Sequence, residues 1–319
     1  MRNNFLGRVG RWLVWAALGV CLTGIAAGFL GRYSANLDVL ANARAHLTGI
    51  AAFAALALWL DYRPVVVLAL GAFLTLAAHG LLAQQNEGPL TGSAMAGRWT
   101  VLSLNTWHAH ADPAALTDAL IEANADVLVL TEFGPNKISE LHQLEKFYPY
   151  RADCAALWDC SIAVLSRHPF TSSGATPEGD GPARVWLTFG KGEDAFTVLG
   201  VHVLEPLRSS TVHAREMSSL AGIALGISGK VLVAGDFNAT PWTSGFARFE
   251  EVSGLRHMGR YLPSFPSGRK GLPQLAIDHM FASQGVRFEE VWLGPDVGSD
   301  HRPVLANIVL PQQALSALR

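Results

Sequence analysis

From Arg98 onward the chain alternates short apolar runs with polar turns and longer amphipathic stretches. Short apolar runs bounded by turn residues predict strands, and stretches of helical period that open on a capping residue predict helices. The expected strands are 99–103, 126–131, 161–166, 183–189, 196–203, 230–234, 276–281, 286–292 and 304–310. The expected helices are 112–123, 137–147, 209–227 and 243–252. This alternation predicts one α/β domain.

Long apolar stretches precede this domain and account for a composition that is 50% hydrophobic and only 16% charged. Two of them, 12–30 and 64–83, contain 19 and 20 uncharged residues. As helices rising 1.5 Å per residue, both can cross a bilayer core of ~30 Å. The stretch 47–60 has 14 uncharged residues, so it either spans with residues borrowed from its N-terminal side or forms a re-entrant or interfacial helix. We expect a membrane region over 1–87 with about three transmembrane helices, and a catalytic domain over 98–319.

The basic residues near the first stretch bear on which side of the membrane the domain faces. Arg2, Arg8 and Arg11 precede it and favour a cytoplasmic N-terminus, although Arg32 and Arg44 dilute the bias. Three spans would then export the domain, whereas two would keep it inside. A cleaved signal peptide is less consistent with the pattern, because two further apolar stretches would still anchor the chain. We expect a multi-pass protein of the inner or plasma membrane with an extracytoplasmic domain.

The three cysteines give a second indication of compartment. Cys21 lies in the first apolar stretch, so Cys154 and Cys160 remain as a lone pair six residues apart. Two thiols that close a short loop are typical of an oxidising compartment, so a disulfide is expected. The alternative is two unrelated core thiols. A zinc site is not expected, because no further Cys or His cluster has ligand spacing.

Residue types with catalytic chemistry stand at the ends of the predicted strands. They are Asn105, Glu132, His202, Asp236 with Asn238, Asp278, and Asp300 with His301. Hydrolysis of a phosphodiester needs a cation for the phosphoryl oxygens, a carboxylate to orient and deprotonate water, and a donor for the leaving oxygen. These side chains supply all three requirements.

In order and spacing, this set resembles the endonuclease/exonuclease/phosphatase superfamily over roughly residues 98–310. Each of these short motifs, taken alone, is more often part of a turn or a helix cap, so the resemblance depends on all of them occurring in this order. It implies an α/β fold of two mixed β-sheets packed as a four-layer sandwich flanked by helices, with the site at one edge. Here that fold would follow a transmembrane helical region.

Glu132 is expected to hold a divalent ion, Mg²⁺ or Mn²⁺, because a carboxylate is the hard oxygen ligand that such ions prefer. Asn105 and Asp300 are expected nearby as further ligands, and Asn105 also as a contact to the substrate phosphate. Some relatives carry an additional acidic ligand just after this asparagine. This chain has Trp107 and His108 there instead, which leaves one or two metals open.

The remaining site residues are expected to act on water and phosphate. Asp236 should orient and deprotonate the attacking water, while Asn238 donates to water or phosphate. His301 should meet the phosphoryl oxygen or the leaving group, with its ring fixed by Asp278, as in the family's paired Asp and His. His202 matches the family's middle histidine, a phosphate donor.

Charge and loops bear on the substrate. From Arg98 onward there are 18 Lys and Arg against 23 Asp and Glu, a net charge of −5, which does not favour tight binding of nucleic acid. The loops 171–182 and 262–273, rich in Gly, Pro and Ser, are where substrate-specific surface is expected. We expect the bilayer to be a partner and the substrate to be a lipid-linked or envelope phosphate. The alternatives are a nonspecific nuclease and a non-enzymatic envelope interaction module; no obligate protein partner is evident.

Overall fold

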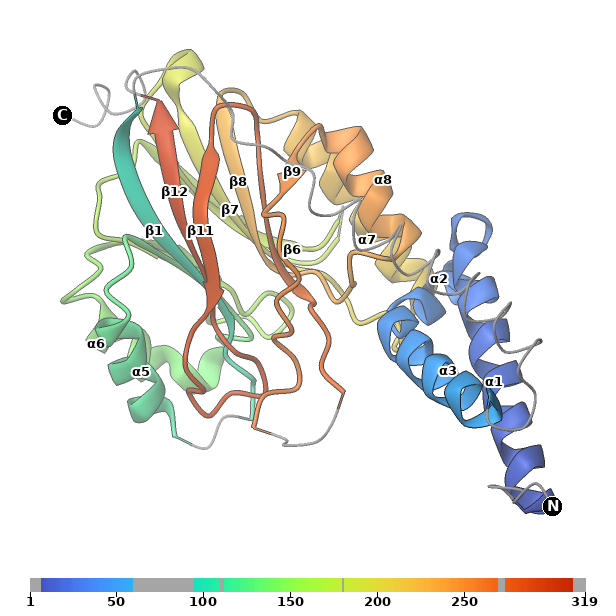
Figure 1. The fold of residues 1–319 in the computed structure, drawn as a ribbon. Coiled ribbons are helices and arrows are strands. Elements are labelled where there is room, and N and C mark those ends of the chain that lie inside the picture. The colour runs from blue at the N-terminus through green and yellow to red at the C-terminus, as the bar shows by residue number, and fades with distance from the viewer. Residues whose placement is uncertain (1–6, 60–94, 110–111, 180, 269–272, 312–319) are drawn as a thin grey trace. The chain divides into compact units, whose positions relative to one another are not determined.

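The computed structural model describes residues 7–59, 95–109, 112–179, 181–268 and 273–311. Two six-stranded sheets form the domain that follows the apolar N-terminal region (Figure 1). The first sheet has the order β11-β12-β1-β2-β4-β3, with β1 (Met95–Asn105), β2 (Val127–Thr131), β3 (Tyr150–Asp153), β4 (Ala163–Ser166), β11 (Arg287–Leu293) and β12 (Val304–Pro311). The second has the order β5-β6-β7-β8-β10-β9, with β5 (Ser172–Thr176), β6 (Ala183–Phe189), β7 (Phe196–His202), β8 (Lys230–Asp236), β9 (Arg256–His257) and β10 (Asp278–Ala282).

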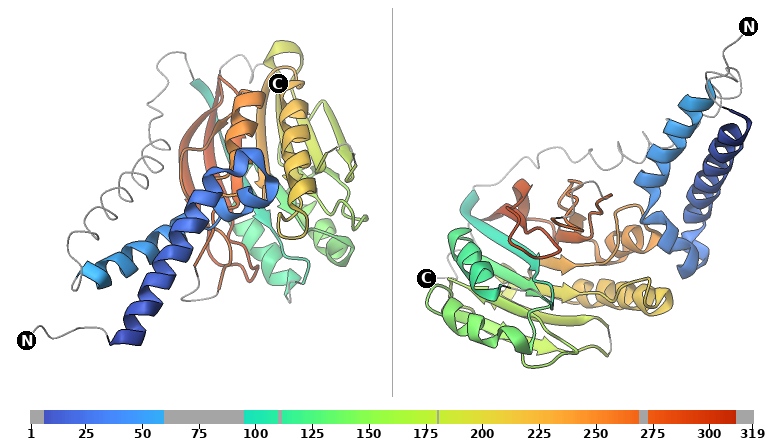
Figure 2. Two further views of the ribbon diagram at one scale, coloured as in Figure 1. Left: turned by 90° about the vertical axis from the view of Figure 1, so that its right-hand side faces the viewer. Right: turned by 90° about the horizontal axis from the view of Figure 1, so that it is seen from below.

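Helices cover the outer face of each sheet (Figure 2). The helices α5 (Pro113–Glu122) and α6 (Ile138–Leu144) lie on the first sheet, and α7 (Ser210–Leu225) and α8 (Ser244–Ser253) lie on the second. Three apolar clusters separate the resulting four layers: one between the sheets, one under α5 and α6, and one under α7 and α8. This arrangement confirms the expected four-layer α/β sandwich.

The central strands of both sheets run parallel in pairs. β1 pairs with β2, and β7 with β8, while the other pairings are antiparallel. β2, with the sequence Val-Leu-Val-Leu-Thr, is buried at every position because one face meets the second sheet and the other meets the helices. Parallel neighbours end at the same edge of a sheet, so β1, β2, β7 and β8 all deliver their carboxyl ends to one side of the sandwich.

Most predicted elements occur near their expected bounds, and 183–189 matches β6 residue for residue. The expectation that 171–182 is wholly a loop is wrong, because Ser172–Thr176 forms β5. The sequence Ser-Ser-Gly-Ala-Thr carries no apolar alternation, and its strand conformation comes from pairing with β6 at the sheet edge. β3, also an edge strand, was not predicted for a similar reason.

A disulfide joins Cys154 and Cys160, with 5.7 Å between their Cα atoms. It closes the loop that connects β3 to β4, and it confirms the pairing expected from the spacing. Cys21, which is buried in the N-terminal region, is free.

The described N-terminal residues form helices α1 (Arg8–Phe29), α2 (Ala35–Ala41) and α3 (Arg44–Trp59). α1 is long and apolar enough to cross a membrane; α2 and α3 qualify only as one span, bent by 59°. The short apolar stretch expected at 47–60 thus belongs to a longer helix, α3, which begins at Arg44. The third stretch, 64–83, lies outside the described residues, which therefore do not support the expected multi-pass arrangement.

Within the described residues, short 3-10 helices are formed by Gly31–Tyr33, Pro135–Lys137 and Gly192–Asp194.

Candidate active site

Every predicted site residue lies at the edge of the sandwich where the parallel strands end, at the bottom of Figure 1. Asn105, His202 and Asp236 are the last residues of β1, β7 and β8. Cross-strand pairing sets His202 beside Asp236, and Asp236 beside Asp278, the first residue of β10. Glu132 directly follows β2 with a positive φ of 50°, so the chain turns sharply at this carboxylate. The fold therefore brings together side chains that are far apart in sequence.

The buried Asn105 side chain joins the two sheets at this edge. Its amide nitrogen donates to Glu132 Oε1 at 2.9 Å and to Asp236 Oδ2 at 3.0 Å. Its amide oxygen accepts from the backbone N–H of Trp107 at 2.9 Å. Two carboxylate neighbours require donors, and this fixes the orientation of the amide. Asn105 thus holds two like charges together, and only the second lone pair of its oxygen is left for the predicted metal contact.

Glu132 is held in its charged form. Its second oxygen accepts from the backbone N–H of His108 at 2.8 Å and lies 2.8 Å from the His108 ring. Burial raises the pKa of Glu132, but the donors Asn105 and His108 and the electrostatic interaction with His202 outweigh burial and lower this pKa to about 2. An ionised carboxylate at this position suits a divalent cation.

The buried Lys137 is a site residue that the sequence analysis did not identify. Its ammonium donates to the backbone carbonyls of Trp107 at 2.8 Å and Glu132 at 3.0 Å, joining the loops that follow β1 and β2. Burial lowers its pKa to about 8, against the opposing effects of Glu132 and Glu140. A lysine at the start of a helix is unfavourable because its positive charge meets the positive end of the helix dipole. This mismatch is the sequence feature that points to a special role for Lys137.

On the second sheet, His301 lies between two carboxylates. Its Nδ1 is 2.7 Å from Asp278 Oδ2, and its Nε2 is 3.8 Å from Asp236 Oδ2. The Ser264 hydroxyl also donates to Asp278 Oδ2, at 2.6 Å. Burial lowers the pKa of His301, but the carboxylates of Asp278, Asp236 and Asp300 raise it to about 10. The ring is therefore an imidazolium, which fits the predicted pairing with Asp278.

Asp236 has the properties of a base that works near neutral pH. Burial and the neighbouring Asp278 raise its pKa to about 6, opposed by His301, His202 and Asn105. Its Oδ1 accepts from the backbone N–H of Asn238 at 2.8 Å. A base is most effective when its pKa lies close to the working pH.

Two of the predicted phosphate contacts, His202 and Asn238, flank Asp236. Nε2 of His202 lies 3.9 Å from Asp236 Oδ2 and 4.0 Å from Glu132 Oε1, so the ring faces both carboxylates. Asn238 has a positive φ of 49°, and its amide nitrogen donates to the backbone carbonyl of Val203 at 2.9 Å. One amide proton of Asn238 is thus used to join this loop to the end of β7. Its second proton is the one that could serve a substrate.

Asp300 provides a test of whether these residues fit a cation. Its Oδ1 is buried without a hydrogen-bond partner among the described residues. Burial raises the pKa of Asp300, and Glu132 is among the charges that raise it further. A carboxylate oxygen withdrawn from water without a donor is stabilised by a cation. Asp300 and Glu132 therefore fit a divalent ion. Asp236, Asp278 and His301 also offer three ligand atoms within 4.8 Å of one another, but the imidazolium of His301 already supplies positive charge to those two carboxylates.

His279, next to Asp278, lies outside the site. Its ring points to the opposite face of β10, because successive side chains of a strand face opposite ways. There it packs against Phe246 and its Nε2 lies 2.8 Å from the backbone oxygen of Ala239.

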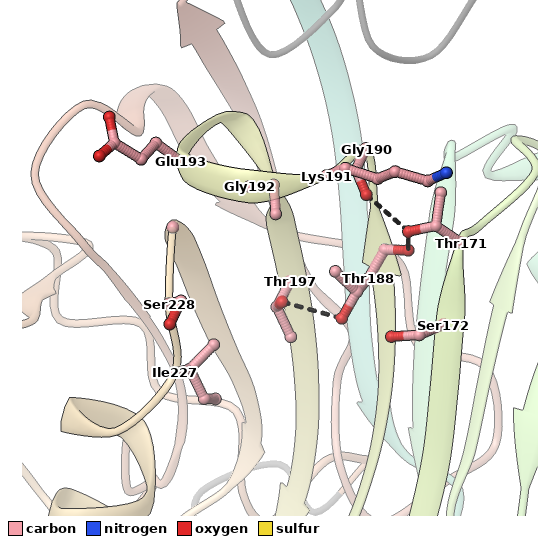
Figure 3. Close-up of a pocket in the computed structure, with 12 residues that line it drawn as sticks. Thr171, Ser172, Thr188, Gly190, Lys191, Gly192, Glu193, Thr197, Ile227 and Ser228 are labelled. Atoms are coloured by element: carbon pink, nitrogen blue, oxygen red, sulfur yellow. Dashed lines mark hydrogen bonds between the residues drawn. The ribbon is translucent and has the colours of Figure 1, made fainter.

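A hollow in the surface lies at the other end of the second sheet (Figure 3). It is lined by Thr188, at the end of β6, by Thr197, at the start of β7, and by the turn 190–193 between them. His202, Asp236 and the other clustered side chains belong to the opposite strand ends, so this hollow is not part of the candidate site.

Comparison with known proteins places this geometry in a family. The Endonuclease/Exonuclease/phosphatase family matches residues 102–301. A search of curated protein sequences found no match. Similar solved structures include humanized D. rerio TDP2, with 13% identity and a TM-score of 0.55 over 66% of this chain and 98% of that chain.

Two further structures are similar to this chain. Sphingomyelinase C from Streptomyces griseocarneus has 16% identity and a TM-score of 0.51, over 66% of this chain and 99% of that one. A mutant beta toxin from Staphylococcus aureus with bound magnesium ions has 15% identity and a TM-score of 0.50, over 66% and 99%. At these identities, the structural similarity shows a common fold and no more. Because the family match spans more than half of the sequence, this chain belongs to the endonuclease/exonuclease/phosphatase family of phosphoester hydrolases.

Proposed function

We propose that this protein is a membrane-anchored, divalent-metal-dependent phosphoesterase that hydrolyses a lipid-linked or envelope phosphate ester. The observation that carries the proposal is the arrangement of Asp236, a buried base with a raised pKa, beside the imidazolium of His301 and the ionised Glu132. A base, a proton-bearing donor and a cation ligand within one cluster are what hydrolysis of a phosphate ester requires.

Each side chain has a defined part in this reaction. Asp236 accepts a proton from the attacking water, and Asn238 orients that water or the phosphate. His301, oriented through its 2.7 Å contact with Asp278, donates to a phosphoryl oxygen or to the leaving group. His202 contributes a further donor. Mg²⁺ or Mn²⁺, held by Glu132 and Asp300, would supply positive charge for the phosphoryl oxygens when bound.

Membrane anchoring is supported by the apolar helix α1. The net charge of −5 after residue 97 bears on the substrate, because it provides no basic surface for nucleic acid. A tether to the bilayer raises the effective concentration of lipid-linked substrates, so basic residues that steer the domain toward phosphate are not needed. A nuclease, by contrast, depends on neutralising many phosphates. Of the two substrate classes, these features favour lipid phosphates.

An activity panel on the full chain tests the function. Phospholipid, isoprenoid pyrophosphate, sugar phosphates and DNA should be compared with Mg²⁺, with Mn²⁺ and with a chelator. We expect metal-dependent hydrolysis of a lipid phosphate. Strong DNA cleavage that falls steeply with salt, without activity on any lipid phosphate, would favour the nuclease. Inactivity on every substrate, with an intact fold and no metal binding, would favour the interaction module.

Replacing Glu132 by glutamine should raise the Mg²⁺ concentration needed for half-maximal activity by about tenfold or more, because a neutral amide is a poorer partner for a small dication. Titration of activity with Mg²⁺ measures the effect. Glu193→Gln, the same change in an exposed side chain near the hollow of Figure 3, is the matched control. An unchanged titration for Glu132→Gln would assign the ion to other ligands.

The extracytoplasmic location that we propose is supported by the Cys154–Cys160 disulfide. Such bonds persist in oxidising compartments and are rare in the cytosol. In protein taken from intact cells, both thiols should therefore resist alkylation until a reductant is added, as mass spectrometry can show. Alkylation of both cysteines before reduction would place the domain in the cytoplasm.

A further inference from the structure

We propose that the rim of the candidate site is a lipid-contacting surface, formed by Leu157 and Trp158 on one side and Leu207 on the other. This inference rests on the proposed function and names how the site would reach a lipid substrate. Leu207 is 86% exposed and Trp158 is 65% exposed, the two highest values among the large hydrophobic side chains of the described sheet domain. Leu157 is 48% exposed.

Strand register places these side chains at the edge that carries the site. Ala163, at the start of β4, pairs with Leu130, two residues before Glu132, so the loop before β4 lies beside Glu132. That loop contains Leu157 and Trp158. Leu207 belongs to the segment that leaves β7 just after His202. The apolar side chains therefore come from loops next to both a proposed metal ligand and a proposed phosphate donor.

The Trp158 side of this rim is held firmly. The disulfide closes its loop, and the Ser161 hydroxyl lies 3.0 Å and 3.3 Å from the carbonyls of Leu157 and Trp158. The Trp158 ring lies against Gly134, where a β-carbon would come within 3.0 Å of it. A tryptophan that is already ordered loses little conformational freedom when it binds, which favours a contact role. Gly134 follows Glu132 by two residues, so the ring has a direct packing connection to the site.

A bilayer surface fits this rim better than other partners do. Tryptophan is enriched at the membrane–water boundary, where its ring meets the headgroup region, and leucine adds apolar area. The exposed Arg208, next to Leu207, offers a cation to lipid phosphate. The chain also carries an apolar helix long enough to cross a membrane, so the proposed anchoring would tether the domain to a bilayer. Scattered exposed hydrophobic residues are common, and it is the placement of the two most exposed ones at the site edge that supports a specific role.

Lipid contact can be measured without relying on catalysis. The full chain is reconstituted in phosphatidylcholine nanodiscs with Leu207→Cys labelled by an environment-sensitive dye, and lipids with brominated acyl chains are then introduced. Leu225→Cys is the matched control, because Leu225 is 63% exposed at the far end of α7. We expect the bromines to quench the dye at 207 and leave the dye at 225 unchanged. Equal quenching at both positions, or none at 207, would overturn the proposal.

Activity provides the second arm. Trp158→Ser and Leu207→Ser should each reduce hydrolysis of a vesicle-embedded phosphodiester by about tenfold more than hydrolysis of a soluble nitrophenyl diester, because burial of such side chains is worth several times RT. Leu225→Ser should leave both rates unchanged. A parallel loss on both substrates would indicate a merely structural role and contradict the proposal. If the wild type hydrolyses no substrate of the activity panel, the proposed function fails, while the quenching result still decides whether the rim meets lipid.

Discussion

Replacing Asp236 by asparagine is expected to lower turnover by about 10²–10⁴-fold, the usual contribution of a positioned general base. The asparagine keeps the shape of the side chain and can still accept the 2.8 Å hydrogen bond from the backbone N–H of Asn238. It cannot accept a proton from water. Folding and binding of substrate should therefore change far less than turnover. Single-turnover kinetics under saturating substrate measure the effect.

Asp194→Asn is the matched control for this experiment. It makes the same chemical change in the Gly192–Asp194 turn, at the opposite end of the second sheet. Its turnover should equal that of the wild type. Near wild-type turnover of purified, folded Asp236→Asn would show that another group deprotonates the water, and the assignment of Asp236 would be withdrawn.

Replacing Asp278 by asparagine is expected to have the second large effect, on both turnover and its pH dependence. In the native protein, Asp278 is the first of the carboxylates that raise the pKa of His301 to about 10. Activity that requires the imidazolium is therefore present below about pH 10 and lost as the pH rises through that value. Without the Asp278 charge, the pKa of His301 should fall toward its ordinary value of ~6.5, and the alkaline limb of the profile should move with it.

The same shift has a consequence for stability. A group whose pKa is raised in the folded state contributes stability that is fully present below its unfolded pKa and declines as the pH rises toward the folded pKa. For His301 the decline runs from ~6.5 to about 10 in the native protein. Asp278→Asn should therefore lose stability mainly at neutral and acidic pH, as measured by urea denaturation at a series of pH values.

Ser264→Ala separates the charge of Asp278 from its hydrogen bonding. The Ser264 hydroxyl donates to the same carboxylate oxygen as His301, but it carries no charge. Its removal should lower turnover less and leave the alkaline limb near its native position. If Asp278→Asn leaves the alkaline limb in place, the imidazolium of His301 does not set it.

Sequence patterns predicted most of this fold because its central strands are buried and therefore consist largely of apolar residues. β2 and β6 were recognised from their apolar residues; β2 ends beside the site, and β6 begins beside it, where Ala183 pairs with His202. Edge strands such as β5 were not predicted, since their strand conformation depends on pairing with a neighbour that the local sequence does not identify. The same distinction applies to the site. Residue types at strand ends identified its members, whereas their partners, for example the two backbone carbonyls bound by Lys137, depend on how separate loops meet.

Amide orientation could not be predicted either. Asn105 was expected as a metal and phosphate contact because its residue type offers both an oxygen and a nitrogen. In the folded protein the nitrogen faces Glu132 and Asp236, carboxylates that come from different sheets. Only the packing of those sheets brings both acids to one amide.

The hydroxyl of Ser299 donates to the backbone carbonyl of Asn105 at 2.7 Å, across 194 residues of sequence. It also accepts from the backbone N–H of His301, at 3.1 Å, so a single serine positions the imidazolium against the end of β1. During synthesis, β1 emerges long before this serine does. The nascent chain consequently carries Asn105, Glu132 and Asp236 for some time without an assembled site. Hydrolytic activity should arise only once β12 has docked, which delays it until nearly the whole domain has been made.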